Sequence, residues 1–156
     1  SGTIELASPP LMEDWQRVQA GFGKASDDGL LLIGRRQLRS NNSWMHNIGT
    51  LMKGKSRCTL LIHPDDAEKR GLADGAMSKI RSKTGELAVA VETSDSMMRG
   101  VVCLPHGFGH DVEGIRMGVA AANPGVPSNV LTGDAVIDSI SGNAVLNGIP
   151  VEVSLA

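Results

Sequence analysis

The sequence LLLIGRRQLRSNNSWMHN, residues 30–47, passes from four apolar residues to a polar segment at a single glycine. Its first part, Leu30–Ile33, is bounded by Gly29 and Gly34, as is typical of a short buried strand. Similar short apolar runs recur at 58–62, 101–104 and 149–153. Because each run is too short for a core helix, we predict strands at all four places.

A β-hairpin is predicted in the middle of the chain, where residues 77–82 and 86–93 flank the turn sequence KTG and apolar residues alternate in the second half. The expected helices are short. In residues 63–71, HPDDAEKRG, a proline and two acids follow His63, and bases and a glycine close the stretch. No strand–helix–strand repeat appears. We therefore predict a mainly β fold, a closed barrel of about six or more strands with crossing connections and two or three short helices.

The expected domain organisation is a lead-in segment, residues 1–29, followed by the barrel domain, residues 30–156. The lead-in contains a short amphipathic stretch at 11–18 and ends in turn residues at 27–29. The first two residues, Ser1-Gly2, are typical of an expression scar, so we expect the native start to be missing.

Composition narrows the class of protein. The 156 residues suit one domain with one sizeable core. A net charge of -2, with two Trp, two Phe and no Tyr, offers neither a basic surface nor the stacking platforms of nucleic-acid binders. No apolar run approaches the roughly 18 residues of a membrane span. We expect no nucleic-acid partner, no membrane partner and a cytoplasmic location.

The two cysteines, Cys58 and Cys103, each lie in an apolar run and are predicted to be reduced, buried and within strands. An iron–sulfur or zinc site would need about four ligands at close spacing, which two cysteines do not supply. The adjacent acids at 27–28 and 65–66 are predicted to be helix-dipole and solvation residues instead of a catalytic pair.

The polar part of the opening sequence, residues 34–47, holds three arginines, two serines, three asparagines and a histidine. A diphosphate is bound by guanidinium groups, hydroxyls and free backbone N–H groups, and heterocycle edges are bound by amides. The segment supplies both kinds of group. The alternative is a solvated loop with a helix N-cap at Asn42 or Ser43.

Two later segments carry further candidate groups. In LPHGFGH, residues 104–110, the glycines would let the backbone approach a planar ligand. A metal is disfavoured because no carboxylate or thiol is placed with the histidines in a recognised ligand spacing. In PSNVLTGD, residues 127–134, Asn129 either contacts a ligand or satisfies its own turn. The motifs of a hydrolase nucleophile elbow and of a phosphate-binding P-loop are absent from the sequence.

Taken in order, these segments resemble the C-terminal molybdopterin-dinucleotide-binding domain of the dimethyl sulfoxide reductase superfamily, which includes molybdenum and tungsten formate dehydrogenases. The resemblance extends from about residue 30 to 153 and includes IHPDDA at 62–67 and RGVV at 99–102. It implies a double-psi β-barrel, similar to the aspartate decarboxylases, that helps to hold bis-molybdopterin guanine dinucleotide. The molybdenum or tungsten would be held by other domains, and the partner would be those domains or a large subunit. The parent would be a molybdopterin-dependent oxidoreductase, formate dehydrogenase-like in one interpretation, and the chain alone would be inactive.

The resemblance also assigns the cofactor-binding residues, and it assigns no catalytic residue and no metal ligand to this chain. Many relatives carry Asp-Pro, Ser-Gly and a Phe-Lys pair near the end, where this chain has DSISG at 138–142 and Leu146-Asn147. The implied cofactor-binding residues are Arg39, Ser40, Asn42, Ser43, His46, His106, Gly107, His110 and Asn129. We add Asn147, at the departure from the family pattern, because its amide could meet a pterin edge. We expect them to meet on one concave face.

Two alternatives of other classes remain. A pyruvoyl decarboxylase with the same barrel would need a Gly-Ser bond for self-cleavage, and the sequence has no Gly-Ser dipeptide. A double-psi barrel that serves as a protein-interaction module without a cofactor would not need the amide-rich loop at 39–47.

Overall fold

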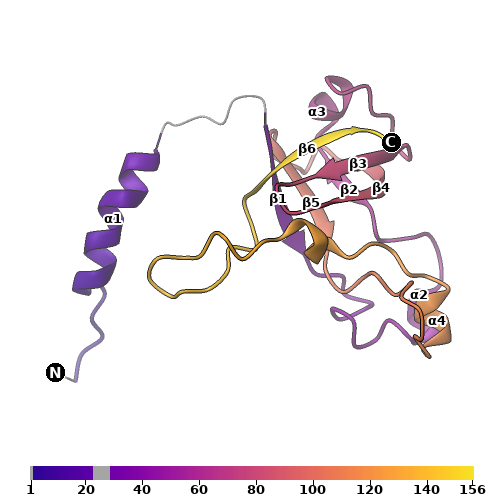
Figure 1. Cartoon of the computed structure of the whole chain (residues 1–156), viewed down its shortest axis with the longest axis horizontal. Coiled ribbons are helices and arrows are strands. Elements are labelled where there is room, and N and C mark those ends of the chain that lie inside the picture. The colour runs from indigo at the N-terminus through magenta and orange to yellow at the C-terminus, as the bar shows by residue number, and fades with distance from the viewer. Residues whose placement is uncertain (1, 23–28) are drawn as a thin grey trace.

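The computed structural model describes residues 2–22 and 29–156. Its centre is a closed barrel in the strand order β1-β5-β2-β4-β3-β6 (Figure 1). The six strands are β1 Leu30–Arg35, β2 Leu60–Ile62, β3 Met77–Arg81, β4 Glu86–Thr93, β5 Val101–Pro105 and β6 Ile149–Leu155. The predicted closed, mainly β barrel is therefore confirmed.

The strand connections cross, as predicted. Strand β1 pairs in parallel with β5 and antiparallel with β6, so the first strand lies between the last two. Strand β2 likewise lies between β4, a parallel neighbour, and β5, an antiparallel one. Only β3 and β4 form the predicted hairpin. Each parallel pair requires a long connection, because parallel neighbours cannot be joined by a tight turn. The candidate site lies on two of the connections, the one from β1 to β2 and the one from β5 to β6.

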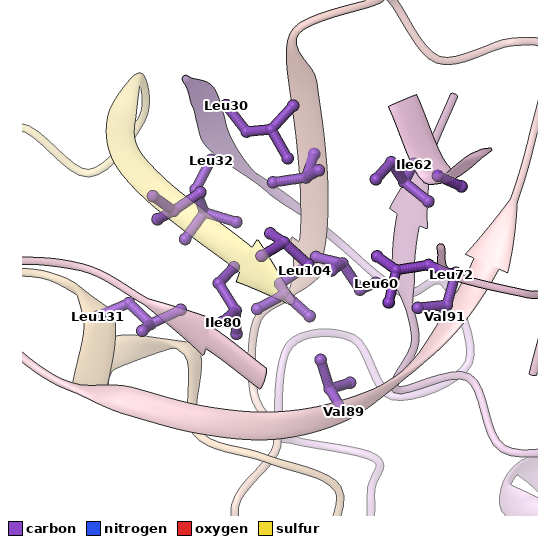
Figure 2. Packing of buried hydrophobic residues seen from close by; sticks show 14 residues of the cluster. Leu30, Leu32, Leu60, Ile62, Leu72, Ile80, Val89, Val91, Leu104 and Leu131 are labelled. Carbon is purple, nitrogen blue, oxygen red and sulfur yellow. The ribbon is translucent and has the colours of Figure 1, made fainter. Parts of the chain in front are cut away.

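The barrel interior is filled by aliphatic side chains from every strand (Figure 2). Strand β3 shows why: Ser78 and Ile80 point inward, whereas the residues on either side of them are exposed. The one hydroxyl among these inward residues, that of Ser78, donates to the Val89 carbonyl at 2.8 Å, so its burial leaves no unmet polar group. Burying one Val, Leu or Ile side chain contributes roughly 1.5–3 kcal/mol, so a core cluster with thirteen such residues and Ala67 dominates the stability of the barrel.

Short helices occupy the connections between strands. They are α2 Gly49–Met52, α3 Pro64–Glu68, α4 Gly118–Ala121 and the 3-10 helix η1 Ser128–Leu131. Helix α3 begins where the sequence predicts, with His63 as N-cap and Pro64 in the first turn. One prediction here is wrong. Asp66 is not a solvated acid: it is buried, and its carboxylate accepts the Gly100 N–H at 2.6 Å. It therefore joins α3 to the start of β5.

Cys58 and Cys103 form no disulfide and are both buried, as predicted. Cys103 lies in β5, but Cys58 does not lie in a strand, because β2 begins only at Leu60. The Cys58 thiol instead accepts the Val126 N–H at 3.3 Å. Burial raises the pKa of this thiol, and Val126 and the nearby Arg35 oppose that effect.

Among the described residues of the lead-in, Pro9–Gly21 form helix α1, which includes the predicted amphipathic stretch. None of its residues is buried. It is linked to the connection that precedes β6, since the Ser139 hydroxyl donates to the Asp14 carboxylate at 2.8 Å. This carboxylate also binds Arg17, and the two contacts lower the pKa of Asp14 to about 2. The predicted turn at 27–28 falls outside the described residues, and the division of the chain at residue 29 stays a prediction.

Candidate cofactor-binding site

The candidate site is built where β1 and β5 end side by side. In the parallel register, Arg35 lies beside Pro105, so the polar loop 36–47 and the turn 106–110 start from neighbouring positions. The His106 N–H continues the pairing by donating to the Arg35 carbonyl at 2.9 Å. Two segments that are about 70 residues apart in sequence therefore leave the barrel together, as the grouping of their residues into one site requires.

The polar loop packs directly on the turn at Gly107. This glycine has a φ of +84°, and a Cβ built on it would lie 2.1 Å from the Asn42 carbonyl oxygen. Only glycine meets both conditions, because the left-handed conformation and the close backbone approach each exclude a side chain. Asn41 and Asn42 also have positive φ values, which asparagine tolerates better than most residues. The glycine and the asparagine pair are therefore explained by one contact between backbones.

Histidines support this contact from within. The His46 side chain is fully buried, and its Nε2 lies 2.9 Å from the Asn123 carbonyl oxygen. Its ring meets the rings of Phe108 and His110 edge to face, with centroids 4.7 and 4.3 Å away. His110 in turn bonds the Gly107 carbonyl through Nε2 at 3.0 Å. Within the described part of the chain, His46 Nδ1 is a buried atom without a hydrogen-bond partner.

Ser40 and His46 are thus interior residues of the loop, at 2% and 0% exposure. Their role in this structure is to support the loop, and their direct contact with a ligand stays a prediction. The end of the loop is held in the same way: the Asn47 side-chain oxygen accepts N–H groups from Val119 and Ala120 at the start of α4.

The three arginines of residues 34–47 differ in their surroundings. The guanidinium of Arg35 is directed into the barrel wall and is not available to an anion. It donates to the Cys103 carbonyl at 2.6 Å and to the backbone and hydroxyl oxygens of Thr59 at 2.9 and 3.0 Å. Arg35 therefore ties together the chain segments on which the site is built. The exposed arginines of the loop are Arg36 and Arg39.

The amide of Asn147 lies at the same end of β1. Its side-chain oxygen accepts the Gly34 N–H at 2.7 Å, which leaves its NH₂ group as a donor. A Cβ built on Gly34 would lie 2.5 Å from His106 Nε2, so this glycine lets the imidazole approach the strand. The placement of Asn147 beside His106 is what the site assignment expects. Burial lowers the pKa of His106, and the charge of Arg36 lowers it further.

Asn129 is exposed in η1, which lies between the 106–110 turn and the β3–β4 hairpin turn. On one side, a Cβ on Gly109 would lie 2.6 Å from Pro127; on the other, a Cβ on Gly85 would lie 2.7 Å from the Val130 carbonyl. The Asn129 carbonyl also accepts the Thr132 N–H and hydroxyl, so the residue does satisfy its own turn through its backbone. That Asn129 and Arg39 share one concave face stays a prediction.

A further cavity adjoins the turn and was not predicted. It has a volume of about 230 Å³, and Lys55, Ser56, Arg57, Phe108 and Asn123 contribute to its lining. The sequence signal that could have identified it is the basic run KGKSR at 53–57. The described residues contain no group of three or more His, Cys, Asp or Glu side chains that could hold a metal ion.

The groups presented here fit a large anionic heterocyclic cofactor better than a metal or a catalytic triad. Arg36, Arg39 and Ser43 are exposed donors for phosphate oxygens, and Asn129 and Asn147 are exposed amides. The close backbone contact at Gly107 places the two donor loops together. Fold and site together define a β-barrel module that binds a cofactor.

Comparison with known proteins gives the family. Residues 30–150 match the molydopterin dinucleotide binding domain, so the chain belongs to this family, and the resemblance seen in the sequence is confirmed. The ligand class is accordingly a molybdopterin dinucleotide.

The chain is 35% identical over 63 residues to the dimethyl sulfoxide/trimethylamine N-oxide reductase of Rhodobacter capsulatus, an alignment that covers 40% of this chain and 7% of the reductase. It is 30% identical over 95 residues to the biotin sulfoxide reductase of Cereibacter sphaeroides, covering 60% of this chain and 13% of that enzyme. The chain thus matches only a small part of these relatives' length.

Acetylene hydratase from Pelobacter acetylenicus has a similar structure, with a TM-score of 0.69 and 20% identity over 93% of this chain and 20% of the hydratase. At this identity the likeness supports the double-psi barrel fold and nothing finer. No helix among the described residues has the length and apolar character needed to cross a membrane.

Proposed function

We propose that this chain binds bis-molybdopterin guanine dinucleotide as the C-terminal domain, or as the small subunit, of a molybdenum or tungsten oxidoreductase. The observation that carries the proposal is the backbone contact of Asn42 with Gly107, which brings the polar loop and the His106–His110 turn together. Guanidinium, hydroxyl and amide groups are then presented from one end of the β1–β5 pair. The bound cofactor would supply the metal and the electron-transfer chemistry.

Each residue then has a binding role set by its chemistry. Arg39 and Arg36 donate to phosphate oxygens, where charge-assisted hydrogen bonds are stronger than neutral ones. Ser43 adds a hydroxyl donor, and the free NH₂ group of Asn147 meets the edge of a heterocycle. His106, with its lowered pKa, is a neutral imidazole at neutral pH and can donate or accept. These residues bind and orient the ligand.

We further propose that the remaining domains or subunit of the parent enzyme pack against this chain. Support comes from α1 and from the connection that follows η1, which Asp14 and Ser139 join. Both expose large apolar side chains, and a contiguous exposed apolar patch is typical of an interaction surface. These side chains are Leu11, Met12, Trp15 and Phe22 in the lead-in and Val136, Ile137 and Ile140 in the connection.

The test is the Arg39→Ala substitution in the full parent protein, with guanosine monophosphate released by acid hydrolysis and molybdenum or tungsten both measured per chain. We expect cofactor content to fall several-fold, because a lost charge-assisted bond typically costs about 1.5–3 kcal/mol. The unfolding free energy should change little, since Arg39 is exposed. Lys69→Ala, at an exposed position on α3's C-terminal side, is the control.

Two results would contradict the proposal. A parent protein that contains no releasable guanosine monophosphate would favour the interaction module without a cofactor. Oxidation of formate, or any other oxidoreductase turnover, by this chain alone would show that it is more than a binding domain.

A further inference from the structure

The strongest feature outside the assigned site is the 230 Å³ cavity beside Phe108. Phe108 belongs to the 106–110 turn, so the cavity adjoins the candidate cofactor site without sharing its donor residues. Ligand sites for drug-sized molecules usually measure about 300–1,000 Å³, so this cavity suits only a part of a larger ligand or a small anion.

The charge of the cavity is positive. Lys55 and Arg57 both line it, and Ser56 between them adds a hydroxyl. One carboxylate is near: Glu92 lies 3.7 Å from the Lys55 ammonium group. The Lys55 side chain is 86% exposed, and an ion pair at such a position is weak and easily displaced. Glu92 is also engaged by the Thr59 hydroxyl at 2.5 Å.

Arg57 is held in place but keeps free donors. Its guanidinium donates to the Lys53 carbonyl at 2.8 Å, and its own carbonyl accepts from Arg35 at 3.4 Å. A guanidinium has five N–H donors in a planar fork, so several remain for a ligand. The side chain is half-buried, which strengthens its interaction with an anion relative to a fully solvated group.

The opposite wall is rigid. The Asn123 carbonyl is bound to buried His46, and its side-chain NH₂ donates to the Val119 carbonyl at 2.9 Å. Gly125 fits closely against Phe108 and Cys58: a Cβ built on it would lie 2.5 Å from the Phe108 ring and 2.8 Å from the Cys58 sulfur. A wall fixed in this way loses little conformational entropy when a ligand binds.

We propose that this cavity binds a phosphate or diphosphate group through Arg57, Lys55 and Ser56. The group could come from two sources, the dinucleotide cofactor itself or a free phosphorylated small molecule, and the recognition chemistry is the same. The cavity is distinct from the loop residues Arg39 and Ser43, so it is a second anion site, and only its assignment to the cofactor's diphosphate rests on the proposed function.

The test is calorimetric titration of the whole chain with inorganic pyrophosphate at low salt. Arg57→Gln should weaken binding roughly tenfold or more, as expected for the loss of one charge-assisted bond, and Arg57→Lys should restore part of it. Lys55→Gln should weaken binding by a smaller factor; its side chain is exposed, so this variant remains informative if Arg57→Gln fails to fold. Lys69→Gln removes the same charge elsewhere and should leave binding unchanged.

The possible outcomes separate this inference from the proposed function. If Arg39→Gln weakens pyrophosphate binding and Arg57→Gln does not, the cavity inference is wrong and the loop site stands. If the unaltered chain does not bind pyrophosphate, or binds it as well after either cavity substitution, the inference is also wrong. If Arg57-dependent binding persists in cofactor-loaded parent enzyme, the natural source is a free phosphate compound; if loading abolishes it, the source is the cofactor.

Discussion

Replacing Gly107 by alanine tests the contact on which the candidate site depends. The new Cβ would lie 2.1 Å from the Asn42 carbonyl oxygen, 2.3 Å from its carbon and 2.9 Å from the Ser43 nitrogen. All three atoms are backbone, so no side-chain rotation relieves the clash. The residue would also have to keep a φ of +84°, which a residue with a Cβ rarely adopts.

The magnitude follows from these two effects. A left-handed conformation costs a non-glycine residue roughly 1–2 kcal/mol, and overpacking typically costs 1–3 kcal/mol. We expect Gly107→Ala to lower the unfolding free energy by about 2–5 kcal/mol, which for a chain of 156 residues corresponds to a fall in Tm of about 5–15 °C.

Urea denaturation followed by far-UV circular dichroism measures the loss. Displacement of the polar loop is reported by the NMR shifts of the Asn42 and Ser43 amides, which lie against Gly107.

The matched control is Gly114→Ala. Gly114 has a φ of +88° and no atom within 4 Å of a built Cβ, so this substitution measures backbone strain alone. A Gly107→Ala variant no less stable than Gly114→Ala, with unchanged Asn42 and Ser43 amide shifts, would refute the close contact between loop and turn.

Three further predictions concern neighbouring groups. Arg35→Ala should lower the unfolding free energy in urea denaturation by about 2–4 kcal/mol, because the carbonyls of Cys103 and Thr59 lose a charged donor. Arg36 is exposed, so the control Arg36→Ala should change the unfolding free energy by less than about 0.5 kcal/mol. In an NMR titration, His106 should have a pKa below its ordinary value of 6.5, and Arg36→Gln should raise that pKa. Because the pKa is lowered in the folded state, the contribution of His106 to stability is present above pH 6.5 and is lost as the pH falls. A measured pKa at or above 6.5 would contradict the burial of the ring. Because the pKa of the Cys58 thiol is raised in the folded state, its contribution to stability is present below pH 9.0 and is lost as the pH rises through the pKa of the folded protein. A Cys58→Ala variant should therefore lose less stability at alkaline pH. Labelling of this thiol in the native protein as fast as in urea would contradict its burial.

Local sequence patterns were sufficient for most of the barrel. The apolar runs at 30–33 and 101–104 became β1 and β5, and the KTG hairpin formed between β3 and β4. These elements depend on residues adjacent in sequence, which is why alternation and turn residues reveal them. The error at Cys58, which precedes β2 by two residues, has the same origin, since the boundary of an apolar run does not mark where pairing begins.

Two side chains could not be interpreted from the sequence because their partners are distant in it. Arg35 is anchored by Cys103 and Thr59, 68 and 24 residues away, and so is not an anion donor. Asp66 is buried because the Gly100 N–H, 34 residues away, needs an acceptor. In both cases, the sequence does not distinguish a polar side chain that contacts solvent or a ligand from one that bonds to another part of the chain.

The sequence by itself determined the class of protein: short strands predicted a barrel, and the ordered polar segments identified the family before any contact was known. Only the tertiary structure decided which groups are available to a ligand. His46 and Ser40 belong to the same polar loop as Arg39, yet they are buried and Arg39 is exposed. The cavity at Lys55 and Arg57 likewise exists only because the segment around Asn123 and the Phe108 turn fold against it. The physical reason is that strand formation depends mainly on local apolar periodicity, whereas the exposure of a polar group depends on what the rest of the chain places over it.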